Sequence, residues 1–219
     1  MKKFAFVSDF DGTLTKKDFY HIVIDTYFKE WGRTFYEDWK KKRKINVEFL
    51  NKIFGAMEKN EEEILAEIHR IPLDEYAEKF IERVKEAGGE FYIVSAGTSY
   101  YIDLLLTHRK IEGVKVISMA GAYKNGGIEI TPDESSPYFS EVFGVNKAKI
   151  IEDLKLEFET VFFAGDSEPD LGAAKGADVA FAKSELKGLL EKEQQDFISF
   201  ENYGEIEQHL QERGWLANG

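Results

Sequence analysis

Short apolar runs recur along the chain, and each run stops at a polar segment that contains turn-forming residues. The runs cover residues 4–7, 91–94, 114–117, 161–164 and 179–182. Continuous apolar runs of this length are typical of strands that are buried on both faces of a sheet. The pattern therefore predicts five buried strands.

Between these runs, apolar residues recur at three- and four-residue steps, as they do along one face of a helix. Tyr76, Phe80 and Val84 form one such stripe, which stops at Gly88-Gly89. Similar stripes begin near Ile150, Leu186 and Ile206. Alternating strands and helices predict an α/β fold, a Rossmann-like parallel sheet flanked by helices, in which ligands bind beyond the carboxyl ends of the strands.

Two segments interrupt this alternation. From about residue 16 to residue 71 only helical patterns occur, and Asn60 stands where a helix N-cap is expected. We expect a helical cap domain at residues 16–72, inserted into a core made of residues 1–15 and 73–219. Asn125-Gly126, between short extended runs, predicts a small β-hairpin within residues 120–130.

Composition and charge narrow the classes of function. The 219 residues are 43% apolar and include no cysteine, which excludes disulfide frameworks, thiolate zinc sites and cysteine nucleophiles. The net charge of −12 disfavours nucleic acid and anionic membranes as partners. The chain has neither a membrane-spanning run nor a targeting pattern, so we expect a cytoplasmic protein. Its oligomeric state is not readable from the sequence.

Two acidic segments follow predicted strands. The first is Asp9-Phe10-Asp11-Gly12-Thr13, and the second is Gly165-Asp166-Ser167-Glu168-Pro169-Asp170. Taken alone, the first also fits an acidic turn and the second an acidic helix start. If both lie at one sheet edge, each carboxylate pair about 4 Å apart costs ~4 kcal/mol at an effective dielectric of 20. A cation must offset that repulsion, and oxygen ligands favour Mg²⁺.

Two further polar residues stand near predicted strand ends or helix starts. Ser95 follows the second strand run, where its hydroxyl and the neighbouring backbone N–H groups suit a phosphate, although a simple helix cap explains it equally well. Lys147 stands at the start of the helix before the Asp166 strand. It can direct a positive charge to the same place, but most lysines at helix ends are only solvated.

The ordered set of these residues resembles the haloacid dehalogenase superfamily. Asp9-x-Asp11-Gly-Thr13, Ser95, Lys147 and Gly165-Asp166-x-x-x-Asp170 match its four motifs and span most of the chain. The helical segment after the first motif is similar to the small cap of the phosphoserine phosphatase branch. An acid at Asp11 is typical of the phosphatases and phosphomutases of the superfamily, whereas its dehalogenases and transport ATPases lack it.

The resemblance implies a Mg²⁺-dependent phosphomonoesterase that forms an aspartyl-phosphate. Asp9 would be the nucleophile, and Asp11 the acid that protonates the leaving oxygen and then activates water, a role that predicts a raised pKa. The remaining roles are implied in the same way: Asp9, the Asp11 carbonyl and Asp166 as metal ligands, Thr13 and Asp170 as their supports, and Ser95, Ala96, Gly97 and Lys147 around the phosphoryl group.

The substrate is expected to be a small phosphorylated metabolite. Asp18 stands where phosphoserine phosphatase carries a glutamate that contacts the substrate amine, and Ala96 and Pro169 also depart from its motifs. The chain looks more like the enol-phosphate phosphatases of methionine salvage, which makes Asp18 a candidate substrate contact. Arg33 and Arg43 are candidate anchors for a carboxylate or a second polar group of the substrate, although an ordinary surface role also fits either of them.

Three alternatives stay open. A phosphoserine phosphatase and a phosphomutase are compatible with the same motifs. A non-catalytic receiver module also places an acidic cluster, a hydroxyl residue and a lysine around Mg²⁺. The Asp11-Gly-Thr13 context and the long helical insertion argue against the receiver module.

Overall fold

A computed structural model describes residues 3–217, so residues 1–2 and 218–219, the ends of the predicted core, lie outside the described residues. Within the described chain, seven strands form one sheet in the order β4-β3-β2-β1-β7-β8-β9. The bounds are β1 Ala5–Ser8, β2 Glu90–Thr98, β3 Val114–Lys124, β4 Gly127–Thr131, β7 Val161–Gly165, β8 Val179–Ala182 and β9 Ile198–Ser199. The five predicted strands are all present, and the α/β class is confirmed.

The first strand lies at the centre of the sheet. It pairs in parallel with β2 on one side and β7 on the other, so that Ser8 is opposite both Ile93 and Ala164. The chain builds the sheet outward from β1 in both directions, which makes the gap between β1 and β7 a topological switch point. The segments that follow β1, β2 and β7 therefore meet at one edge of the sheet.

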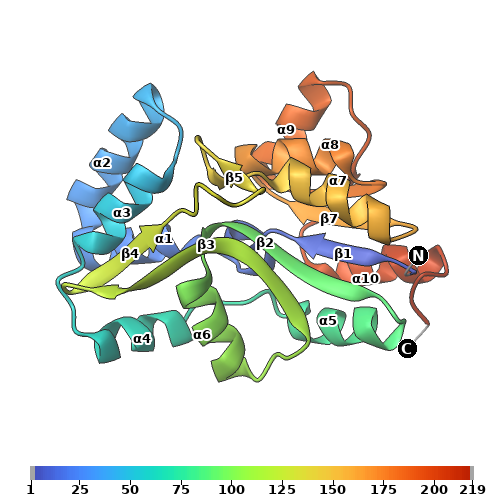
Figure 1. The fold of residues 1–219 in the computed structure, drawn as a ribbon, viewed down its shortest axis with the longest axis horizontal. Coiled ribbons are helices and arrows are strands. Elements are labelled where there is room, and N and C mark those ends of the chain that lie inside the picture. The colour runs from blue at the N-terminus through green and yellow to red at the C-terminus, as the bar shows by residue number, and fades with distance from the viewer. Residues whose placement is uncertain (1–2, 218–219) are drawn as a thin grey trace.

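Helices cover both faces of the sheet (Figure 1). One face carries α5 (Ala77–Glu86), α6 (Ser99–Arg109) and α10 (Tyr203–Glu212), and the other carries α7 (Lys147–Glu157), α8 (Leu171–Gly176) and α9 (Ser184–Lys192). Aromatic rings fill the layer beneath α5. Phe6 lies 4.7 Å from Phe80 and 5.5 Å from Phe91, measured between ring centroids. This packing holds the central strand, and hence the segment after it, in place.

The chain between β1 and α5 is helical, as predicted. It forms turns at Phe10–Leu14 and Ile24–Phe28 and the helices α1 (Phe19–Val23), α2 (Lys29–Lys42), α3 (Val47–Gly55) and α4 (Glu61–His69). Asn60 caps α4 in a capping box with Glu63, which confirms its expected role. The two ends of this helical segment lie side by side, joined by a β-bridge between Thr15 and Leu73. A separate cap domain at residues 16–72 stays a prediction.

The hairpin predicted around Asn125-Gly126 is confirmed. Strands β3 and β4 pair antiparallel, and both turn residues have positive φ, 50° for Asn125 and 86° for Gly126, as this turn requires. Strand β3 is longer than its apolar run because it first pairs with β2 and then continues into the hairpin. A small ribbon of β5 (Phe139–Ser140) and β6 (Gly144–Val145) lacks an apolar run and was not expected.

The alternative explanation of Ser95 as a simple helix cap is wrong. Strand β2 runs on through Thr98, and α6 begins at Ser99 with the Thr98 side chain as its cap. The pairing of β2 with β3 is irregular between Val94 and Thr98, so the strand continues past its apolar run without regular register. Ser95 therefore lies within an extended segment.

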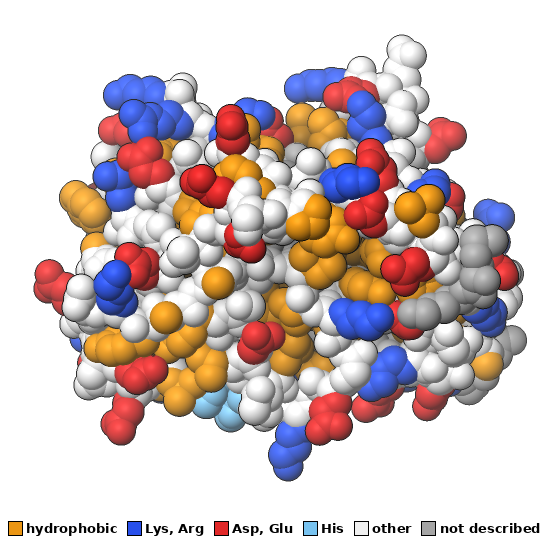
Figure 2. Space-filling model, viewed as in Figure 1, with side chains coloured by type: hydrophobic (Ala, Val, Ile, Leu, Met, Phe, Trp, Pro, Cys, Tyr) orange, Lys and Arg blue, Asp and Glu red, His pale blue; other side chains and the backbone are white. Residues whose placement is uncertain are grey.

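The surface carries charges of both signs. Figure 2 shows acidic and basic side chains interspersed over one face, and an indentation in the upper outline between the α2–α3 region and the α8–α9 region. Among residues 3–217, every helix is too short or too polar to cross a membrane.

Candidate active site

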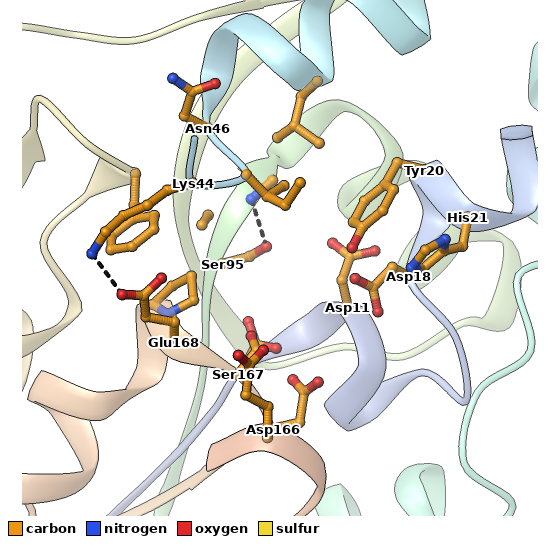
Figure 3. A pocket seen from close by; sticks show the side chains of 18 of the residues that line it. Asp11, Asp18, Tyr20, His21, Lys44, Asn46, Ser95, Asp166, Ser167 and Glu168 are labelled. Carbon is orange, nitrogen blue, oxygen red and sulfur yellow. Dashed lines mark hydrogen bonds and ion pairs between the residues drawn. The ribbon is translucent and has the colours of Figure 1, made fainter. Parts of the chain in front are cut away.

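A pocket of about 640 Å³ lies beyond the carboxyl ends of β1, β2 and β7. Residues of the helical segment, including Tyr20, Tyr36 and Leu50, line it together with residues from the strand ends. Asp11, Asp18 and Tyr20 gather on one side, Asp166 and Ser167 lie at the floor, and Lys44 and Glu168 lie opposite (Figure 3). Nearly all the predicted site residues line this pocket, namely Asp9, Asp11, Asp18, Arg43, Ser95, Ala96, Gly97, Lys147 and Asp166.

Lys147 joins two of the carboxylates. Its Nζ donates to Asp9 Oδ1 at 2.5 Å and to Asp170 Oδ1 at 2.7 Å, and all three side chains are buried. Burial lowers the pKa of Lys147, but Asp170 and Asp9 outweigh that effect and leave the pKa above its usual range. Burial raises the pKa of Asp9 to about 6, although Lys147 partly opposes the rise. The lysine is therefore a fixed positive charge beside Asp9.

Hydrogen bonds with Asp170 and Thr13 hold the Asp166 segment in place. Asp170 Oδ2 accepts from the backbone N–H groups of Asp166 and Ser167, both at 3.0 Å. The Thr13 hydroxyl donates to Asp166 Oδ1 at 2.9 Å. These contacts are compatible with the expected roles of Thr13 and Asp170, which are to support the metal ligands.

Gly12 allows the two acidic segments to approach each other. Its φ of +76° lies in the left-handed region, and a Cβ there would lie 2.7 Å from Asp18 Oδ1 and 2.8 Å from Asp166 Oδ2. A side chain at this position would therefore be strained and would push the carboxylates apart.

The carboxylates fit a hard divalent cation. Oxygens of Asp9, Asp166 and Asp170 all lie within 4.8 Å of one another. Burial and the neighbouring Asp9 and Asp170 raise the pKa of Asp166 to about 9, so the group resists ionisation without a cation. Because both Asp170 oxygens already accept hydrogen bonds, Asp9 and Asp166 are the better ligands. Oxygen donors of this kind suit Mg²⁺.

Asp11 is held at both carboxylate oxygens. Oδ1 accepts from the Phe19 backbone N–H at 2.9 Å, and Oδ2 accepts from the Tyr101 hydroxyl at 2.5 Å. Burial and the nearby Asp18 raise the pKa of Asp11 to about 7, so the predicted rise is present. Burial also raises the pKa of Tyr101 well above 10, which keeps its hydroxyl protonated. Asp11 can therefore both give and take a proton near neutral pH.

Ser95 and Gly97 lie on the strand-end side of the pocket. The Gly97 N–H donates to Ser95 Oγ at 2.9 Å, which leaves the serine hydroxyl proton free to donate elsewhere. Gly97 is closely packed, since a Cβ there would lie 1.7 Å from the Tyr101 hydroxyl oxygen. The extended Ser95–Thr98 segment thus brings a hydroxyl and backbone groups to the pocket without a helix start.

The two arginines have different positions. Arg43 lines the pocket but pairs with Glu48 at 3.0 Å, whereas Arg33 pairs with Asp25 and is not among the pocket-lining residues. Lys44 reaches across to Glu168 at 2.6 Å. The pairing of Lys44 with the segment after β7 was not predicted.

Several pocket residues were missed by sequence reasoning. Tyr101 is the most important, because it contacts Asp11 directly. It lies in the first turn of α6, six residues after Ser95, and this short spacing is the only signal that links it to the strand end. Phe143, on the connection between β5 and β6, had no signal of this kind.

Comparison with solved structures shows the same fold. A phospho-aspartyl intermediate analogue of phosphoserine phosphatase superposes with a TM-score of 0.69 at 19% identity, covering 95% of this chain and 99% of the other. A substrate-bound phosphoserine phosphatase gives a TM-score of 0.69 at 20% identity, covering 95% and 98%.

Similar sequences are named as phosphatases. A 2-hydroxy-3-keto-5-methylthiopentenyl-1-phosphate phosphatase of Bacillus pumilus is 27% identical, over 90% of this chain and 89% of its own. A polyol phosphate phosphatase of Saccharomyces cerevisiae, PYP1, is 29% identical, over 94% and 92%. The sequence model of the haloacid dehalogenase-like hydrolases matches residues 6–175. The chain therefore belongs to the haloacid dehalogenase-like hydrolase family.

Proposed function

We propose that this hydrolase is a Mg²⁺-dependent phosphomonoesterase, which acts on a small phosphorylated metabolite in the cytoplasm through an aspartyl-phosphate. The observation that carries the proposal is the pairing of two aspartates in different settings. Asp9 lies 2.5 Å from the Lys147 ammonium, whereas Asp11 is held by Tyr101 and has a pKa raised to about 7. One carboxylate is thus suited to attack and the other to proton transfer.

The reaction has two halves. In the first, an Asp9 oxygen bonds to phosphorus while the bond from phosphorus to the ester oxygen breaks, and protonated Asp11 gives its proton to that oxygen. In the second, water bonds to phosphorus, Asp11 takes the proton that water loses, and the bond between Asp9 and phosphorus breaks. Asp11 ends protonated and Asp9 ends as a carboxylate, which restores the starting state.

The metal would be held by the carboxylates of Asp9 and Asp166 and by the backbone carbonyl of Asp11. When bound, Mg²⁺ supplies positive charge that offsets the repulsion between the carboxylates and the anionic phosphoryl group. Lys147 and the Ser95 hydroxyl are proposed to bind the phosphoryl oxygens, together with the backbone N–H of Ala96.

Residues 16–72 are proposed to act as a cap over this site. The chain enters and leaves the segment through two adjacent connections, bridged at Thr15 and Leu73, which suits a hinge. Lys44 of the segment pairs with Glu168 beyond β7, on the opposite wall of the pocket. Opening would admit the substrate, and closure would exclude water during the first half of the reaction.

The first candidate substrate is the enol-phosphate named for the Bacillus pumilus relative, 2-hydroxy-3-keto-5-methylthiopentenyl-1-phosphate. Ile45, Leu50 and Phe143 line part of the pocket and supply apolar surface for a methylthio group. A polyol phosphate is the second candidate, supported by the yeast relative and by Asp18, whose carboxylate can accept hydrogen bonds from substrate hydroxyls.

The test is phosphate release from a panel of esters in Mg²⁺ or in EDTA. The panel contains an enol-phosphate diketone analogue, glycerol 1-phosphate, phosphoserine, sugar phosphates and p-nitrophenyl phosphate. The proposal expects turnover that requires Mg²⁺ and disappears in Asp9→Asn. Folded protein that hydrolyses none of these esters would contradict it, and a requirement for a sugar bisphosphate would indicate a mutase.

A further inference from the structure

Tyr101 is a buried tyrosine whose hydroxyl contacts the proposed proton-transfer group. Its side chain is 1% exposed, and its hydroxyl donates to Asp11 Oδ2 at 2.5 Å. The other oxygen of Asp11 accepts from the Phe19 backbone N–H at 2.9 Å. The Asp11 carboxyl group is thus held between α6 of the core and the first residue of α1.

The surroundings of Tyr101 fix the position of its hydroxyl. Its ring packs against Phe10, Phe19 and Phe54, with centroid distances of 5.9, 5.1 and 6.0 Å. A phenylalanine would fill the same apolar space, so packing alone does not call for the hydroxyl group. The hydroxyl is also close to the Thr98 backbone N–H, which can donate to the phenol oxygen and leave the phenol proton for Asp11.

The space for this hydroxyl depends on Gly97. A Cβ on Gly97 would lie 1.7 Å from the Tyr101 hydroxyl oxygen and 3.0 Å from Asp11 Oδ2. The absence of a side chain at Gly97 therefore leaves a gap in which the tyrosine hydroxyl meets the aspartate. Gly97 near the end of β2 and Tyr101 near the start of α6, four positions apart, are both fitted to this one contact.

We infer that Tyr101 is a positioning residue for Asp11, which holds the carboxyl group in one orientation so that it faces the ester oxygen in the first half of the reaction and water in the second. The inference rests on the proposed proton-transfer role of Asp11. Without the hydroxyl, only the hydrogen bond from the Phe19 N–H to Oδ1 would restrain rotation of the carboxyl group about its Cβ–Cγ bond. Proton transfer depends steeply on such alignment.

The test is Tyr101→Phe with esters whose leaving groups differ in their need for a proton. Rapid-quench measurements would give the rate of aspartyl-phosphate formation from two esters. The phenolate of p-nitrophenyl phosphate leaves without a proton, whereas the alkoxide of glycerol 1-phosphate must be protonated as it leaves. The rate with glycerol 1-phosphate is expected to fall at least about 10-fold more than the rate with p-nitrophenyl phosphate. A merely structural role would slow both esters equally, and equal losses, or no loss, would overturn the inference.

Two controls separate the possible failures. Tyr100→Phe removes the hydroxyl of the neighbouring tyrosine, which faces Glu61 at 3.4 Å, and is expected to leave both rates unchanged. Asp11→Asn should show a larger leaving-group dependence than Tyr101→Phe. If Asp11→Asn slows both esters alike, the proposed role of Asp11 fails. If only Tyr101→Phe lacks the dependence, Asp11 keeps its role and the inference about Tyr101 fails. Thermal unfolding of each variant checks that the fold is kept.

Discussion

Raising the pH of the metal-free protein is expected to destabilise its fold. Burial raises the pKa of Asp166 to about 9 and that of Asp11 to about 7, from the ordinary value of 3.8. At pH 7 the folded protein therefore keeps a proton on Asp166 and half a proton on Asp11, whereas the unfolded chain has lost both. These two carboxyl groups together bind about one and a half more protons in the folded state than in the unfolded state.

This proton surplus sets the sign and the size of the effect. Because Asp166 and Asp11 bind more protons in the folded state, their contribution lowers the free energy of unfolding as the pH rises, by about 2 kcal/mol per pH unit near pH 7. The stability is fully present below the unfolded pKa of 3.8 and is lost as the pH rises through the folded pKa of Asp166, about 9. Bound Mg²⁺ favours the ionised carboxylates, so it should flatten the slope and release protons on binding.

Urea unfolding in EDTA and in Mg²⁺, at several values between about pH 6 and pH 8, measures both slopes. Asp166→Asn is the matched control, because an amide does not titrate. It should lower the metal-free slope by about 1.4 kcal/mol per pH unit. A free energy of unfolding that stays constant or rises with pH in EDTA would refute the reasoning about the acidic cluster.

Two substitutions test the groups around the carboxylates. Lys147→Met should destabilise the metal-free protein by about 3–5 kcal/mol, because Asp9 and Asp170 then stay buried without the lysine ammonium. The loss of stability should be smaller in Mg²⁺. Chemical unfolding with and without the metal measures this loss, and equal losses in both would count against a cation site here. Thr13→Val should weaken Mg²⁺ binding about 10-fold, because its hydroxyl orients Asp166. Calorimetric titration measures this affinity, Thr13→Ser should restore it, and an unchanged affinity in the valine variant would show that the hydroxyl does not orient a ligand.

The sequence predicts the part of the site that parallel-sheet geometry assembles. Asp9 and Asp166 each follow an apolar strand run, and neighbouring parallel strands bring their carboxyl ends to one edge. Lys147 is the first residue of a helix that the apolar stripe beginning near Ile150 predicts. These residues meet because the topology of the sheet brings the ends of their strands and helix to the same edge.

The rest of the site depends on side-chain packing, which periodicity does not encode. The Tyr101 hydroxyl contacts Asp11 in a space that exists because Gly97 has no side chain. Ser95 lies in a strand that extends beyond its apolar run. The contact of Lys44 with Glu168 depends on how the helical segment lies over the sheet, a relation that no local pattern specifies. Arg33 and Arg43 look alike in sequence, yet only Arg43 lines the pocket.

The central claim is that Asp9 carries the phosphoryl group during turnover. The most direct measurement is acid quenching of the protein during hydrolysis of p-nitrophenyl phosphate in Mg²⁺, followed by peptide mass spectrometry. The account predicts a phosphorylated peptide with the modification on Asp9, which forms within the first turnover and disappears when substrate is exhausted. Turnover that proceeds with Asp9 unmodified, or with the phosphoryl group on another residue, would contradict it.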